Sequence, residues 1–69
     1  MSAIVLTNLG KLEAEKMQGN GPEFAVISLL YEMDGPVDFE EVCDETHMST
    51  EKASMICHGL INKGYVKEA

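Results

Sequence analysis

The sequence predicts one small, mainly α-helical domain with a short β ribbon, and three observations lead to that prediction. Most of the 69 residues fall in four segments whose apolar side chains recur at helical spacing. Only the two ends, residues 3–7 and 65–66, have the β-branched and aromatic character of strands. Gly and Pro separate the segments, and no repeat or low-complexity stretch indicates a second domain, so we expect one domain over residues 1–69.

The first strand, "AIVLT", leads into a helix over about residues 8–18. Thr7 or Asn8 is expected to cap this helix, because a side-chain oxygen there can accept from a free N–H of the first turn. Gly10 lies early in the helix, where a missing side chain indicates close packing or a loose first turn. The apolar residues spaced to share one face, with charges between them, are Leu9, Leu12 and Met17.

The second helix covers about residues 22–34 and is the most apolar of the four. Gly19 suits the end of the preceding helix, and Pro22 suits the first position of this one. A helix that is apolar around most of its surface belongs in the middle of a fold. Gly35 and Pro36 end it sharply. Its apolar residues are Phe24, Ala25, Val26, Ile27, Leu29, Leu30 and Met33.

A short third helix is predicted over about residues 39–46. Asp38 is a good N-cap, and Glu41 stands three residues later, as in a capping box. Val37 and Val42 occupy the two positions of a hydrophobic staple. The inner face of this helix would consist of Phe39, Val42 and Cys43.

The fourth helix begins after Ser49, which is an N-cap residue, and runs to about residue 63. Gly64 follows as the C′ residue, and a strand closes the chain. Because an isolated strand is not stable, we expect the two terminal strands to pair antiparallel. The core-facing stripe of the fourth helix is Ala53, Ile56, Cys57, Leu60 and Ile61.

Residues 23–66 resemble the winged-helix branch of the helix-turn-helix proteins. The resemblance is carried by the apolar first helix, by "DGPVDFEEV" at the start of a short second helix, by "MS" in the turn, and by "LINKGYV" at the end of the third. It implies a helix-turn-helix over about residues 38–64, within a winged-helix-like three-helix core that carries an N-terminal strand and helix. It also implies DNA binding through the last helix of that motif.

A second segment, "LTNLGKLEAE", resembles the strand-to-helix passage that follows the wing in many such regulators, although here it stands at the N-terminus. The sequence departs from the family pattern in three further ways, one of which is that the recognition helix is poor in base-reading residues. The second wing strand can come only from residues 3–7, so the wing loop is missing. His47 stands where Gly commonly makes the turn, and a left-handed backbone is expected there. The match of "LTNLGKLEAE" to the strand-to-helix passage is carried by Leu6, Thr7, Gly10, Ala14 and Glu15.

The charge balance restricts the function. Twelve acidic residues face five lysines, there is no Arg, and the net charge is −7. Affinity for DNA comes largely from Lys and Arg set against phosphates. A DNA-binding form of this chain must therefore gather its lysines on one face, with Lys52 and Lys63 joined by Lys11 or Lys16. The alternative is a basic protein partner.

The leading expectation is a small winged-helix protein that binds double-stranded DNA as a transcription-associated regulator and acts as a dimer. The alternative is a winged-helix protein-interaction module without DNA binding, which would bind a basic protein or a second copy through an acidic surface over residues 38–45 or through Met33, Met48 and Met55. The candidate nucleic-acid-binding residues are Ser49, Thr50, Lys52, Ser54, Met55, His58, Asn62 and Lys63.

No enzyme, cofactor, metal or small-molecule substrate is expected. The sequence has no glycine-rich phosphate loop and no nucleophile with a partner base, and a core this small is expected to leave no pocket. Cys43 and His47 have a spacing that could ligate zinc, but Cys43 and Cys57 both fall on core stripes. With no signal peptide, no membrane-spanning run and two Cys, the expected location is the cytoplasm.

Overall fold

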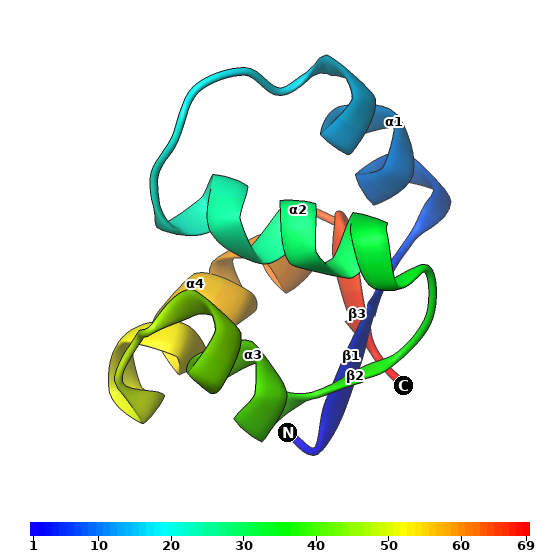
Figure 1. Cartoon of the computed structure of the whole chain (residues 1–69). Coiled ribbons are helices and arrows are strands. Elements are labelled where there is room, and N and C mark those ends of the chain that lie inside the picture. The colour runs from blue at the N-terminus through cyan, green and yellow to red at the C-terminus, as the bar shows by residue number, and fades with distance from the viewer.

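The computed structural model describes residues 1–69, which form four helices around a three-stranded antiparallel sheet (Figure 1). The four predicted helices are confirmed within one or two residues at each end. The elements in chain order are β1 (Ala3–Leu6), α1 (Asn8–Lys16), α2 (Pro22–Met33), β2 (Val37–Asp38), α3 (Phe39–Thr46), α4 (Thr50–Asn62) and β3 (Val66–Glu68).

The sheet has the strand order β2-β1-β3, so the N-terminal strand lies in the middle. β1 and β3 pair antiparallel, which confirms the predicted pairing of the terminal strands. The amide N of Ala69 donates to the carbonyl O of Ala3 at 3.0 Å, so the two ends of the described chain lie side by side. The β1–β3 register is Ile4 with Glu68, Val5 with Lys67, and Leu6 with Val66.

The sequence did not predict β2. This strand is only two residues long and pairs with β1 through Asp38 opposite Ala3 and Val37 opposite Ile4. Two residues cannot display the alternation by which a strand is recognised, so only the tertiary pairing makes them a strand.

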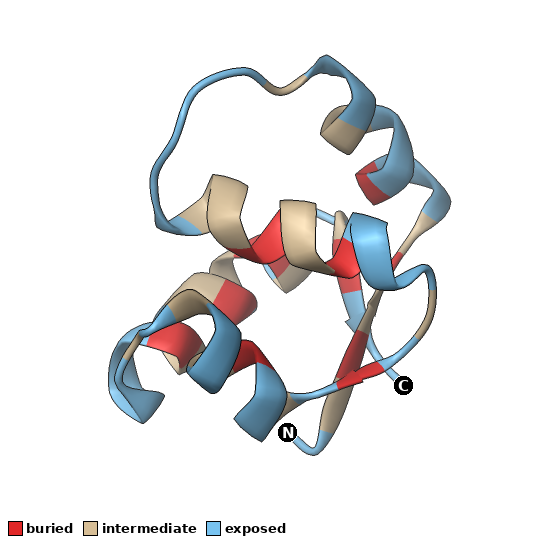
Figure 2. Ribbon diagram, in the orientation of Figure 1, coloured by how far each residue is buried: buried red, intermediate tan, exposed pale blue.

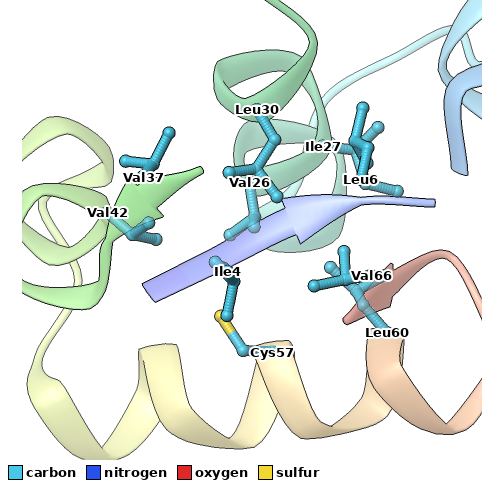
Figure 3. Close-up of a cluster of buried hydrophobic side chains, with 10 residues drawn as sticks. All are labelled: Ile4, Leu6, Val26, Ile27, Leu30, Val37, Val42, Cys57, Leu60 and Val66. Carbon is cyan, nitrogen blue, oxygen red and sulfur yellow. The ribbon is translucent and has the colours of Figure 1, made fainter. Parts of the chain in front are cut away.

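The core lies between α2, the sheet, α3 and α4, with side chains from all six of these elements turned toward one another (Figure 3). The predicted central place of α2 is confirmed, because three of its side chains are almost completely buried. The hydrophobic residues of the core are Ile4, Leu6, Val26, Ile27, Leu30, Val37, Val42, Ala53, Cys57, Leu60 and Val66.

Helix α1 packs differently from the sequence expectation. Leu9 and Leu12 remain 51% and 56% exposed, and they do not share a buried face with Met17. The inner face is formed instead by Gly10, which is buried, and by Ala14 and Met17, which pack against the core. Figure 2 shows the rest of α1 exposed or half-buried.

A close backbone approach at Gly10 explains this orientation. A Cβ atom at Gly10 would lie 1.9 Å from the carbonyl O of Tyr65, so only glycine fits. Thr7 holds the same junction, because its amide N donates to Tyr65 O at 3.0 Å and its hydroxyl donates to Gly64 O at 2.5 Å. Thr7 is also the confirmed N-cap of α1 and accepts from Gly10 N at 3.0 Å.

The capping box predicted for α3 is wrong. Asp38 occupies the N-cap position, but its side chain makes no capping hydrogen bond. The amide N of Phe39 donates instead to the carbonyl O of Ser2 at 2.8 Å. The chain ahead of β1 therefore supplies a main-chain acceptor at the start of the helix, and Asp38 remains exposed in the sheet-edge strand β2.

Candidate functional site

Helices α3 and α4 are joined by the three residues 47–49 and pack against each other. His47 ends α3 with a left-handed backbone, φ 57°, as the sequence predicts. Ser49 is the N-cap of α4 and accepts from Lys52 N at 3.2 Å, which confirms the predicted cap. Gly64 follows α4 with φ 84°, which is the left-handed conformation expected of a C′ glycine. These local signals produce two helices with a tight turn between them.

The structure places all the candidate nucleic-acid-binding residues on α4 or its caps. At a spacing of 100° per residue, a single stripe points directly away from the core side chains Ala53, Cys57 and Leu60. We call this stripe the outer α4 face, and all its members are exposed; they are Glu51, Met55, His58 and Asn62. Among the other candidates, Ser49, Thr50, Lys52 and Lys63 are exposed, and Ser54 is half-buried.

The outer α4 face carries an acid and an apolar side chain but no lysine. Met55 is 72% exposed, which is the highest value among the large hydrophobic residues of the chain. Glu51 lies one turn before it on the same stripe. The two lysines, Lys52 and Lys63, lie to one side of the stripe, on the flank of α4 that is turned toward the beginning of α2.

Lys63 is already engaged within the molecule. Its ammonium nitrogen lies 3.1 Å from both carboxylate oxygens of Glu23, at the start of α2. This is the only ion pair in the structure. Gly59 leaves the room that the Glu23 carboxylate occupies, since a Cβ atom at this glycine would lie 4.0 Å from it. Lys63 therefore faces an internal counter-charge.

Lys52 lies in a hollow where the first residues of α2 and α4 meet. The hollow has a volume of about 300 Å³ and is bounded by both helix starts and by the turn before α4. Helix N-termini carry a partial positive charge, although the first turns of these two helices also hold Glu23 and Glu51. The lining residues are Gly21, Pro22, Ala25, Thr46, His47, Met48, Ser49 and Lys52.

The remaining lysines are Lys11, Lys16 and Lys67. Lys67 is exposed on β3, where it lies opposite Val5 of β1. Lys11 and Lys16 belong to α1, which Figure 1 shows on the far side of α2 from α4. Lys11 borders a hollow with Tyr31 and Asp34 at the end of α2, whereas Lys52 borders the hollow at its start. The twelve residues of α2 separate these places by about 18 Å. DNA binding would require Lys11 or Lys16 to share one face with Lys52. Neither of them does.

The methionines do not form one patch. Met48 packs against the core from the turn, Met33 is exposed at the end of α2, and Met55 is exposed on α4. The acidic side chains of residues 38–45 all remain exposed: Asp38, Glu40, Glu41, Asp44 and Glu45.

The cysteines lie in or beside the core, as their positions on core stripes predict. Cys57 is fully buried and Cys43 is half-buried, and both are free thiols. Burial raises the pKa of Cys57 to about 11, with a smaller contribution from Cys43. No group of three or more His, Cys, Asp or Glu side chains is placed to hold a metal ion.

The four helices all fall short of the length and apolar character that a bilayer span needs. Comparison of the chain with protein-family models, with curated proteins and with solved structures finds no match.

Proposed function

We propose that this chain is a winged-helix-like interaction module that binds a protein partner through the outer α4 face and does not read DNA. The observation that carries the proposal is the composition of that face. Its exposed apolar side chain is Met55, its only charge is that of Glu51, and the neighbouring Lys63 is paired with Glu23. A DNA-reading helix needs cations at this place, whereas a flexible exposed Met suits contact with protein.

The winged-helix likeness supports the proposal through the arrangement of the strands. β1 lies antiparallel beside β3, in the place where the resemblance puts the second wing strand. α1 then follows β1, as the segment "LTNLGKLEAE" implies. The fold thus offers the last helix of a helix-turn-helix, α4, as its natural contact surface.

A basic partner surface fits the charge of this molecule. The net charge is −7, and five exposed acids lie along residues 38–45 beside α4. Complementary charge would accelerate association and orient the partner, while burial of Met55 would supply apolar contact at the centre.

DNA binding is the second candidate, and the hollow at Lys52 favours it. Two helix N-termini, the Ser49 hydroxyl and an ammonium group lie around this hollow, and each of these can contact a phosphate. A single module with one lysine at this hollow would need a second copy to hold a DNA site, so this candidate implies a dimer.

Salt-titrated binding to a fluorescent random-sequence DNA duplex separates the two candidates. Non-specific DNA binding is strongest at low salt, on the order of 20–50 mM. The protein-binding proposal predicts no change in fluorescence anisotropy in that range. The DNA candidate predicts binding that weakens steeply with salt and is lost in Lys52→Ala. Glu23→Gln releases Lys63, so it should strengthen any genuine DNA binding.

The partner surface is tested with Met55→Asp and with Leu12→Asp as its matched control on α1. Both side chains are more than half exposed, so neither substitution should disturb folding. A specific partner should be retained by the wild type and by Leu12→Asp but not by Met55→Asp. Its affinity, measured by calorimetry, should fall at least tenfold in Met55→Asp. Equal affinity for all three proteins would place the binding surface away from α4.

A further inference from the structure

A second hollow, distinct from the α4 surface, lies between α1, β1 and the end of α2. It has a volume of about 380 Å³, within the range typical of small-ligand sites. Its apolar lining is Val5, Leu6, Leu30 and the ring of Tyr31, and its polar lining is Lys11, Glu15 and Asp34, with Gly35 beside them.

Two of the polar groups are already satisfied by each other. The hydroxyl of Tyr31 donates to the carboxylate of Glu15 at 3.0 Å. This hydrogen bond, followed by the charge of Glu15, raises the pKa of Tyr31 above its ordinary value of 10.0. Tyr31 and Glu15 are thus hydrogen-bonded to each other at the rim.

Lys11 and Asp34 are left without partners. The only ion pair in the structure is between Lys63 and Glu23, so the Lys11 ammonium lies more than 4.0 Å from the carboxylates of both Asp34 and Glu15. One unpaired cation and one unpaired anion, carried by different elements, thus border the same apolar floor.

The end of α2 determines where Asp34 lies. Asp34 ends α2 in the left-handed conformation, φ 53°, although the flexible Gly35 stands one position later. Asp is one of the few non-glycine residues that adopt this conformation, and the amide N of Asp34 donates to Leu30 O at 3.1 Å, as at an ordinary helix end. This helix end sets Asp34 at the rim of the hollow.

We propose that this hollow binds a zwitterionic α-amino acid with an apolar side chain. The carboxylate of the ligand contacts Lys11, its ammonium group contacts Asp34, and its side chain lies on Val5, Leu6 and Leu30. Neither a simple amine nor a simple carboxylic acid satisfies both unpaired charges. The hollow is open to solvent, so the dissociation constant is on the order of 1 mM. This site is independent of the function proposed for α4.

The test is a titration of the ¹⁵N-labelled full chain with leucine, followed by NMR. Leucine should shift the amide signals of Lys11, Tyr31, Asp34 and Gly35 saturably. Three analogues should each bind at least tenfold more weakly: leucinamide lacks the carboxylate, 4-methylpentanoate lacks the ammonium group, and glycine lacks the apolar side chain. The proposal is overturned if leucine gives no saturable shift, or if any analogue binds as tightly.

Asp34→Gly separates a binding role from a structural one. Glycine relieves the left-handed backbone, so this variant should unfold at the same or a higher urea concentration than the wild type. It should nevertheless bind leucine at least tenfold more weakly. Lys11→Gln should weaken binding similarly, whereas Lys16→Gln, on the same helix but away from the hollow, should not change it. Unchanged affinity in Asp34→Gly or Lys11→Gln contradicts the proposed contacts.

Discussion

At the scale of single residues, the attachment of α1 to the rest of the molecule depends on Gly10. The hydrogen of this residue faces the carbonyl O of Tyr65 at a place where a Cβ atom would lie 1.9 Å away. Backbone cannot yield as a flexible side chain does, so Gly10→Ala must push α1 away from the α4–β3 junction. We expect the free energy of unfolding, measured with urea, to fall by about 2–4 kcal/mol.

Gly59→Ala is the matched control for this prediction. Gly59 is also a helical glycine, but a Cβ atom there would meet only Glu23 Oε2, at 4.0 Å. The usual preference of helices for Ala should then raise stability by about 0.5–1 kcal/mol. If both substitutions changed stability in the same direction, the close approach at Gly10 would not be the cause.

The thiol of Cys57 makes stability depend on alkaline pH. Its pKa is about 11 in the folded chain, against an ordinary value of 9.0, because burial disfavours the thiolate. Below pH 9 the thiol is protonated in both states, so its contribution to stability is complete. Between about pH 9 and 11 the unfolded chain ionises first, and stability falls by up to about 2 kcal/mol.

Urea unfolding in reducing buffer at pH 8 and pH 10.5 measures this loss. Cys57→Ala should remove the part of the slope that belongs to the thiol, although it lowers stability at both pH values by leaving a cavity. Cys43→Ala should retain most of the slope, because burial of Cys57 is the larger cause of the shift. A slope that is identical in wild type and Cys57→Ala would assign the alkaline loss to other groups.

Several single-residue features could be predicted because they depend only on residues close by in the sequence. The left-handed turn at His47 and the cap at Ser49 depend on local geometry, and both predictions are confirmed. For Gly10 the sequence left two explanations open, and the position of Tyr65, which is distant in sequence, decides for close packing.

At the scale of elements, the starts of α3 and α4 differ although both have a favourable N-cap residue. Ser49 bonds to Lys52 N, whereas the Asp38 side chain makes no capping bond. Ser49→Ala should therefore lower the free energy of unfolding by about 1 kcal/mol. Asp38→Ala should cost only a few tenths, through its charge at the helix start. Thermal and urea unfolding of the two variants measure the difference. If both substitutions lowered the free energy of unfolding equally, the Asp38 side chain would have to cap α3 after all.

The orientation of α1 could not be predicted from its apolar spacing. Leu9 and Leu12 are the largest apolar side chains of the helix, and periodicity favours their burial. The short contact at Gly10 instead turns the small residues inward and leaves both leucines exposed. The spacing of apolar residues cannot predict that a helix will pack through a close backbone contact.

At the scale of the whole molecule, the adjacent ends of β1 and β3 allow the chain to be reconnected. Ala69 bonds to Ala3, so a two-residue Asn-Gly linker between Ala69 and Met1 would form a short hairpin loop. The chain could be opened at Asn20, because residues 18–21 are exposed and no atom lies near Gly19 or Gly21. The permuted order would place a wing loop between β3 and β1, as the winged-helix resemblance implies.

We expect this circular permutant to fold with an unchanged circular dichroism spectrum and an unfolding free energy within about 1–2 kcal/mol of the original. The control is a permutant opened at Leu30, in the middle of the buried helix α2, which should not fold. If the permutant opened at Asn20 also failed to fold, the continuity of the α1–α2 connection would be essential to the fold.

The candidate site, like strand β2, could be predicted only in part, because it depends on contacts between segments far apart in the sequence. Local sequence determines that α4 exists, where it is capped and that Met55 points away from its inner stripe. It cannot determine that Glu23, forty residues earlier, pairs with Lys63, or that Lys11 and Asp34 border one hollow. Long-range charge pairing depends on which helix starts and ends become neighbours.

The sequence by itself determined four helices, the cap at Ser49, the left-handed turn at His47 and the pairing of the terminal strands. These follow from interactions within a few residues and from the need of an isolated strand for a partner. The tertiary structure alone decided the strand β2, the inward face of α1 and the separation of the lysines. Each of these depends on contacts between segments far apart in the chain. Steric fit and charge pairing can act on such contacts only after the helices have packed.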